Sequence, residues 1–266
     1  MGILAEIVEN KKREIAELRA RGGPPSLRDL GREPIDVVRA LARPIGAPLR
    51  LITEIKFKSP SAGALSKKLD AAARAVIYAR AGAAMISVLC DRHFFDGSYE
   101  DLESARSALD REKLAAPLLC KEFVLDEVQL DWARVRGADA VLLIARILEG
   151  EALARLVEAA VRRGLEPLVE VTSEEEIDRA LATRARVFGV NARDLDTLKI
   201  DPKRAAELVA RVSPERVALH FSGVKNQDDL DSVARGRADG ALIGEVLMRE
   251  DDPSALLASF VEASYV

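Results

Sequence analysis

The sequence predicts an α/β protein that folds as a single (β/α)8 TIM barrel with an N-terminal helical extension. Three observations favour this fold class. Eight short apolar runs alternate with helical patterns along the chain after Pro48. The runs are almost continuously apolar, as in parallel strands that are covered on both faces. Each strand-helix unit takes roughly 20 to 35 residues, the length of a crossover between parallel strands.

The first 48 residues precede this pattern, and we assign residues 1–48 to the extension and 49–266 to the barrel. Apolar residues recur at helical spacing over 3–18, which predicts an amphipathic helix. Gly22–Ser26 ends this helix, and a short second helix is expected over Asp36–Leu41. We expect the first helix to pack across the barrel base or over its rim.

The eight expected strands are short and apolar, and they lie at Arg50–Ile55, Met85–Leu89, Pro117–Cys120, Ala140–Ile144, Pro167–Val171, Val187–Val190, Val217–Phe221 and Gly240–Ile243. Helical patterns between them cover Ala71–Arg80, Tyr99–Leu109, Glu127–Arg136, Glu151–Arg163, Ser173–Leu181, Pro202–Val212 and Asp228–Ala234, and a last helix follows Pro253. Several of these helices are followed by glycine, which suits the left-handed position that ends a helix. A doubly wound open sheet is the alternative, but its glycine-rich first turn is missing.

The composition argues against several classes of partner. The 40 basic and 44 acidic side chains leave a net charge of −4, whereas a nucleic-acid binder usually has a basic excess. No apolar stretch approaches the roughly 18 to 20 residues that a membrane span needs. Glu6 and Glu9 interrupt any signal-peptide core. We therefore expect a cytoplasmic protein without nucleic-acid or membrane partners, and we expect a monomer or weak dimer.

Few residues suit a metal or redox centre. Cys90 and Cys120 lack CxxC spacing, which favours a packing role and a reducing compartment. His93 and His220 are too few for a histidine-rich zinc site, and we expect a surface role for the first and a packed role for the second. The dinucleotide, P-loop, zincin and α/β-hydrolase motifs are missing from the sequence. The functions that these motifs serve therefore lack their usual support in the sequence.

Charged residues lie where several strands end, at the edge on which barrel enzymes carry their active sites. Glu54 and Lys56 lie two apart on the first strand and therefore share a face. Lys121 and Glu170 end the third and fifth strands. A charge at such a position is costly if it is buried and unpaired, so it needs solvent, a partner or a ligand.

The ends of the last three strands add further candidates: Asn191, Arg193, Ser222, Gly223, Gly244 and Glu245. Short loops of this kind offer backbone N–H groups that hold phosphate in many barrels. Two lysines and an arginine in one cleft favour an anionic substrate. A lysine and a glutamate that face each other can divide acid and base roles. The set predicts an enzyme that acts on an anionic, phosphorylated small molecule.

Eight motifs, in order, resemble the indole-3-glycerol phosphate synthase family. They are Glu54–Ser61, Ser87–Leu89, Phe95–Ser98, Lys121–Phe123, Asp139–Ile144, Glu166–Glu170, Gly189–Leu195 and Leu242–Glu245. The resemblance extends over nearly the whole chain and includes the N-terminal helix. Any one motif would be weak, whereas several in the family's order are specific.

The resemblance implies a decarboxylating, dehydrating ring closure of 1-(2-carboxyphenylamino)-1-deoxyribulose 5-phosphate to indole-3-glycerol phosphate, without metal or organic cofactor. It implies that Lys121 is the general acid and Glu170 the general base. Lys56 would hold the substrate carboxylate and share the acid role, and Glu54 would orient Lys56. Asn191 would contact the region of the reacting hydroxyl.

The resemblance also implies a phosphate site and a closing loop. The phosphate would be surrounded by Arg193, Ser222, Gly223, Gly244 and the backbone of Glu245, whose carboxylate we expect to turn away. Ser59 and Ser61 would lie in a mobile first loop that closes over the site.

Two positions depart from the family pattern. Glu122 stands where the family usually has aspartate, a mild change. Phe221 stands where the family usually has glutamate, so a ring replaces a carboxylate at the substrate, and we expect weakened or altered activity. His220 points to the opposite face of the strand and cannot substitute. The alternatives are a divergent phosphate-sugar barrel enzyme, such as one like phosphoribosylanthranilate isomerase, and a non-catalytic binding barrel.

Overall fold

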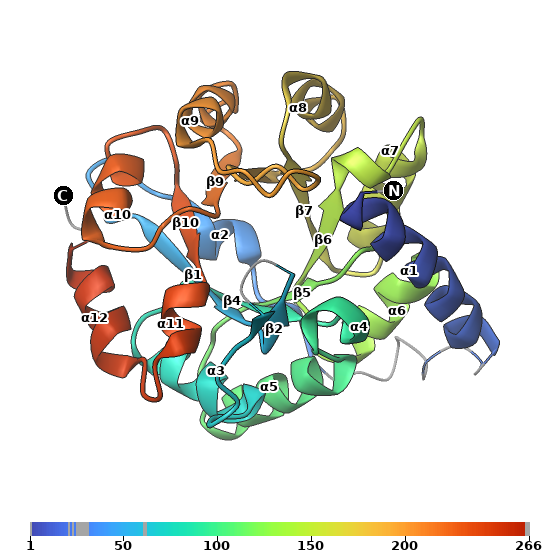
Figure 1. The fold of residues 1–266 in the computed structure, drawn as a ribbon, viewed down its shortest axis with the longest axis horizontal. Coiled ribbons are helices and arrows are strands. Elements are labelled where there is room, and N and C mark those ends of the chain that lie inside the picture. The colour runs from blue at the N-terminus through green and yellow to red at the C-terminus, as the bar shows by residue number, and fades with distance from the viewer. Residues whose placement is uncertain (1, 21, 23, 25–31, 61–62, 264–266) are drawn as a thin grey trace.

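The computed structural model describes residues 2–20, 22, 24, 32–60 and 63–263. Eight strands in these ranges form the barrel: β1 (Arg50–Ile55), β4 (Met85–Leu89), β5 (Leu118–Lys121), β6 (Ala140–Ile144), β7 (Glu166–Val171), β8 (Val187–Asn191), β9 (Val217–Phe221) and β10 (Gly240–Ile243). All neighbours pair in parallel, and β1 pairs with both β4 and β10, which closes the ring (Figure 1). The predicted (β/α)8 barrel is confirmed, and the open-sheet alternative is wrong.

Helices surround this ring in Figure 1. They are α3 (Ala71–Arg80), α5 (Tyr99–Arg111), α6 (Glu127–Val135), α7 (Ala152–Arg162), α8 (Glu174–Leu181), α9 (Pro202–Ala210), α10 (Gln227–Ala234) and α12 (Ser254–Ala263). Most begin where an N-cap side chain accepts a first-turn N–H, as Asp70, Ser98, Asp126, Ser173, Asp201 and Asn226 do. Such caps satisfy backbone donors that the helix itself leaves unpaired, so they set where each helix starts.

Two layers of apolar side chains bury both faces of the barrel strands. The inner layer fills the ring and includes Ile52, Met85, Leu119, Leu142 and Leu219. The outer layer joins the strands to the helices. Because alternate residues of a strand point to opposite faces, a strand buried on both sides is apolar along most of its length, which explains the nearly continuous runs in the sequence.

The N-terminal segment packs on both ends of the barrel. Helix α1 (Ile3–Ala20) lies beside α6 (Figure 1). Helix α2 (Val37–Leu41) places Val37 and Leu41 in the inner apolar layer. The guanidinium of Arg43 donates to the carbonyls of Ala234 and Ala238, which precede β10. The predicted helices of the extension are therefore present, whereas the predicted end at Gly22–Ser26 lies largely outside the described residues.

Small differences from the predicted elements affect the site. Strand β5 runs on to Lys121 and β8 runs on to Asn191, so both side chains are held by the sheet itself. The sequence did not predict several short elements: β2 (Lys58–Ser59), β3 (Gly63–Ala64), α4 (Arg92–Phe95), the 3-10 turn η2 (Ala145–Ile147) and α11 (Glu245–Arg249). Elements this short carry no measurable hydrophobic period. Among the described helices, none combines the length and apolarity that crossing a bilayer would require.

Candidate active site

A cavity of about 360 Å³ opens at the carboxyl ends of the strands. Every residue that the sequence proposed for the site lines it, apart from Ser61, which lies outside the described residues. The predicted residues that meet there are Glu54, Lys56, Ser59, Lys121, Glu170, Asn191, Arg193, Phe221, Ser222, Gly223, Gly244 and Glu245. They come from six different strands and the loops that follow them, because the parallel ring brings all its carboxyl ends to one edge.

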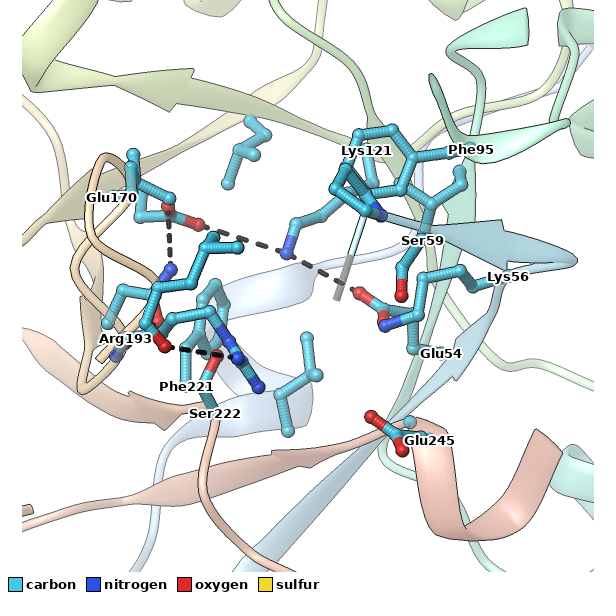
Figure 2. A pocket seen from close by; sticks show the side chains of 18 of the residues that line it. Glu54, Lys56, Ser59, Phe95, Lys121, Glu170, Arg193, Phe221, Ser222 and Glu245 are labelled. Atoms are coloured by element: carbon cyan, nitrogen blue, oxygen red, sulfur yellow. Dashed lines mark hydrogen bonds and ion pairs between the residues drawn. The ribbon is translucent and has the colours of Figure 1, made fainter. Parts of the chain in front are cut away.

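The ammonium of Lys121 lies between two carboxylates, as Figure 2 shows. Its Nζ is 3.5 Å from Oε1 of Glu54 and 3.8 Å from Oε2 of Glu170. The other oxygen of Glu54 accepts a hydrogen bond from Lys56. One buried carboxylate on β1 therefore holds two lysines, and the predicted common face of Glu54 and Lys56 is confirmed.

On the opposite side, Glu170 is fixed by the neighbouring strand. The side-chain amide of Asn191 donates to Oε1 of Glu170 at 3.1 Å, and the backbone N–H of Arg193 donates to Oδ1 of Asn191 at 3.0 Å. The guanidinium of Arg193 in turn contacts the carbonyl of Leu198 at 3.4 Å. This chain of hydrogen bonds turns one face of Glu170 toward Lys121 and the cavity.

The two carboxylates differ in their pKa values. Burial alone would raise the pKa of Glu54, but the charges of Lys56 and Lys121 outweigh it and lower that pKa to about 2. Burial raises the pKa of Glu170, and the opposing effects of Lys121 and Asn191 do not cancel the rise. Glu54 therefore stays ionised, whereas the raised pKa of Glu170 makes it the carboxylate better suited to take up and release a proton.

Phe221 occupies the floor of the cavity and is almost fully buried. Its ring lies under the Lys121 ammonium, 4.9 Å from Nζ to the ring centroid. The register of β8 and β9 places Phe221 beside Asn191. Gly189 makes room for the ring, because a Cβ there would lie 2.6 Å from it. His220 lines a different cavity on the outer side of β9, as its alternation with Phe221 predicts.

Backbone groups and two arginines lie at the far side of the cavity. Ser222 and Gly223 follow β9, and Gly244 and Glu245 follow β10. Gly244 allows Glu54 to lie close, because a Cβ at this position would be 2.8 Å from Oε2 and 3.0 Å from Cβ of Glu54. The Glu245 carboxylate accepts from Arg249 at 2.7 Å, which lowers its pKa. The carboxylate therefore pairs with a residue of its own helix, and Figure 2 shows it lying away from Lys121.

The apolar wall of the cavity contains residues that the sequence did not assign to it. They are Ile3, Leu4 and Ile7 of α1 together with Leu89, Phe95, Phe123, Leu142, Ile144, Leu195, Leu198 and Leu242. All of these except Leu198 and the residues of α1 lie within the family motifs, which was the available signal. The residues of α1 had no such signal, because their spacing predicts only that one face of the helix is buried.

The structure offers little for a metal or redox group. No three His, Cys, Asp or Glu side chains in the described ranges are placed to hold a metal ion. Cys90 and Cys120 are buried thiols. Burial raises the pKa of the Cys90 thiol, which makes it a poor nucleophile. The polar side chains that line the cavity include lysines, carboxylates and an amide.

A sequence profile of indole-3-glycerol phosphate synthase matches residues 4–260. The enzyme of that name from Streptomyces griseus is 38% identical over 263 residues, which is 99% of this chain and 96% of the relative. The one from Kineococcus radiotolerans is 40% identical over 268 residues, with the same two coverages. The chain belongs to the indole-3-glycerol phosphate synthase family. This confirms the resemblance and the predicted activity, a carbon-carbon lyase of tryptophan biosynthesis that acts on a phosphorylated small molecule.

Solved structures of other enzymes share the barrel. The 3-hexulose-6-phosphate synthase from Salmonella typhimurium aligns with a TM-score of 0.62 at 10% identity, over 81% of this chain and 98% of that one. At this identity the likeness extends to the fold only. Membership of the indole-3-glycerol phosphate synthase family rests on the sequence matches and on motifs that the structure brings into one cavity.

Proposed function

We propose that this indole-3-glycerol phosphate synthase closes the indole ring between Lys121 and Glu170. The observation that carries the proposal is the Lys121 ammonium, which lies between the carboxylates of Glu54 and Glu170 above a cavity with an apolar wall. An acid and a base on opposite sides of one cavity can serve the two proton transfers that the reaction needs.

In the first step, the ring carbon that bears the substrate carboxylate attacks the C2 carbonyl of the ketose. Lys121 donates a proton to the carbonyl oxygen as it becomes a hydroxyl. Lys56 holds the carboxylate until it leaves as carbon dioxide, whose bonding electrons return to the ring. Glu54 keeps both lysines in place, since its low pKa leaves it ionised throughout.

In the second step, the new hydroxyl leaves as water and a proton is lost. Lys56, which still carries its proton, protonates the departing hydroxyl, and Glu170 accepts the proton that is released. The raised pKa of Glu170 supports this role, because a base must be able to hold the proton it removes. Asn191 fixes the Glu170 carboxylate through its hydrogen bond and faces the same reacting hydroxyl.

The phosphate is placed at the other end of the cavity. Arg193 supplies positive charge, and the backbone N–H groups of Ser222, Gly223, Gly244 and Glu245 supply hydrogen bonds without side-chain motion. Ser59 on β2 lines the cavity from the first loop, which we propose closes over the bound substrate. Phe221 forms the floor of the cavity, and the face of its ring contacts the Lys121 ammonium.

We further propose that the protein acts in the cytoplasm without a metal, an organic cofactor, a membrane or a nucleic acid, and as a monomer or weak dimer. The near balance of acidic and basic residues supports the absence of a nucleic-acid partner. Size-exclusion chromatography with light scattering tests the oligomeric state, and a tight dimer or larger assembly would contradict it.

The decisive experiment measures turnover of 1-(2-carboxyphenylamino)-1-deoxyribulose 5-phosphate through the fluorescence of the indole product. We expect turnover by the parent protein in the presence of a chelator and its near-complete loss in Lys121→Met. Lys203→Met, which changes an exposed lysine on α9, is the matched control and should retain the parent rate. No turnover by the parent, or undiminished turnover by Lys121→Met, would overturn the proposal.

A further inference from the structure

A short stretch of backbone separates two cavities. Ser222, Gly223 and Val224 line the active-site cavity, and Gly223 and Val224 also line a second cavity of about 110 Å³. The second cavity lies between α9 and α10 on the outer side of β9. Cavities therefore lie on both sides of this wall, although Val224 itself is buried in the outer apolar layer.

The wall has a backbone conformation that needs support. Ser222 has φ of 67° and Gly223 has φ of 92°, so two consecutive residues are in the left-handed region. Glycine adopts this region readily, but a residue with a side chain does so uncommonly. Such residues persist where the surroundings determine their conformation.

His220 forms a hydrogen bond to this wall from the side of the second cavity. The residue is 5% exposed, and its Nε2 lies 3.0 Å from the carbonyl oxygen of Ser222. A carbonyl oxygen only accepts, so Nε2 carries the proton and donates. The strand holds His220 in turn, because β9 pairs it with Val190 on one side and Ala241 on the other.

The same bond determines where the next N–H points. The carbonyl of Ser222 and the N–H of Gly223 belong to one planar trans peptide, so they point in opposite directions. With the carbonyl held toward His220 and the second cavity, the Gly223 N–H is turned toward the active-site cavity. Further along the wall, Asp229 accepts from the backbone N–H of Lys225 at 2.9 Å, which holds its other end.

We propose that His220 is a positioning residue for phosphate: by holding the Ser222 carbonyl on the outer side of the wall, it aims the Gly223 N–H at the phosphate of the substrate. This inference rests on the proposed function for the location of the phosphate. Nothing in the proposed proton transfers uses His220, so its loss weakens binding of the phosphate and leaves the chemical step largely intact.

The test compares three variants by titration calorimetry with inorganic phosphate and by steady-state kinetics. His220→Leu removes the donor and should raise both the phosphate Kd and the substrate KM about five- to thirtyfold, with kcat near the parent value. His220→Gln carries an amide nitrogen at a similar reach and should recover most of the affinity. Ser232→Ala, a change on α10 in the same cavity, is the control and should behave as the parent.

Folding of each variant is checked by circular dichroism, and His220→Asn, whose amide is too short to reach Ser222, replaces His220→Leu if that variant does not fold. Parent-like phosphate affinity in the donor-free variant would overturn the inference, as would equal losses in His220→Leu and His220→Gln. A parent protein that binds phosphate yet converts no ketose phosphate would refute the proposed function, while the phosphate titrations would still decide the role of His220.

Discussion

The ammonium of Lys121 lies over the ring face of Phe221, with 4.9 Å between Nζ and the ring centroid. Attraction between a cation and a ring face is worth about 0.5 to 2 kcal/mol, more when water is excluded. By resemblance to the family motif, a glutamate is expected at the position of Phe221. In this chain, Lys121 is thus held by two carboxylates and a ring rather than by a further negative charge.

Replacement of Phe221 by leucine should reduce kcat by about two- to thirtyfold, because the Lys121 ammonium loses the ring face that holds it. Phe188→Leu is the matched control, since Phe188 places its ring against Arg216 on the outer side of the barrel. We expect it to retain kcat. Steady-state kinetics with both variants checks this, and an unchanged kcat in Phe221→Leu would argue against a role for the ring.

The fit between Gly189 and Phe221 predicts a strong coupling between the two positions. A Cβ at Gly189 would lie 2.6 Å from the Phe221 ring and 3.0 Å from Leu168. Gly189→Ala should therefore destabilise the protein by about 1 to 3 kcal/mol. In the Phe221→Leu background the same change should cost less than half as much, as measured by urea unfolding. Additive free energies of unfolding would contradict the proposed contact.

The pH dependence of the reaction should report on Glu170. Burial raises the pKa of Glu170, and the Asn191 amide opposes that rise. A base must be ionised to act, so activity is present above this pKa and is lost as the pH falls through it. We expect the acid-side midpoint of kcat to lie above 4.5, the ordinary value for glutamate. Glu54, with a pKa of about 2, adds no midpoint in this range.

Asn191→Ala tests this assignment. Loss of a hydrogen bond to the charged form raises the pKa of Glu170 further, so the acid-side midpoint should move to higher pH. The measurement is kcat as a function of pH, at saturating substrate, for the parent protein and for Asn191→Ala. A midpoint that stays in place or moves to lower pH would exclude Glu170 as the base.

A buried ion cluster joins α1 to the strand that carries Lys121. The Nζ of Lys11 lies 3.0 Å from Asp91 and 2.9 Å from Glu122, and all three side chains are buried. Burial raises the pKa of Glu122 to about 7 despite the charge of Lys11. Lys11→Met should therefore destabilise the protein by about 3 to 5 kcal/mol, because two carboxylates lose their counter-charge.

The stability that the protein loses in Lys11→Met should depend on pH. A pKa raised from 4.5 to about 7 means that the folded protein loses stability as the pH rises through this interval. Without Lys11 the pKa of Glu122 rises further, so the variant continues to lose stability above pH 7. Lys12→Met is the control, since Lys12 is exposed and pairs with Glu9 on the surface. Urea unfolding at pH 5 and pH 8 measures both, and equal losses for the two variants would contradict the cluster's role.

The sequence by itself determined the barrel and the edge at which the site lies. Strands buried on both faces are apolar along most of their length, and crossovers between parallel strands are long, so the alternation alone predicts eight strand-helix units. The polar residues that end those strands then had to meet, because a closed parallel ring has only one carboxyl edge. The motifs around Lys121 and Glu170 added the family.

Only the tertiary structure decided which groups contact each other. Glu54 and Lys121 are 67 residues apart, and their contact depends on the closure of the ring and on the register of β1, β4 and β5. The periodicity of α1 predicts a buried face but not the surface that covers it, so the place of Ile7 in the cavity could not be deduced. The raised pKa of Glu170 depends on burial and on neighbours brought from other strands, which are properties of the folded ring rather than of any segment of the chain.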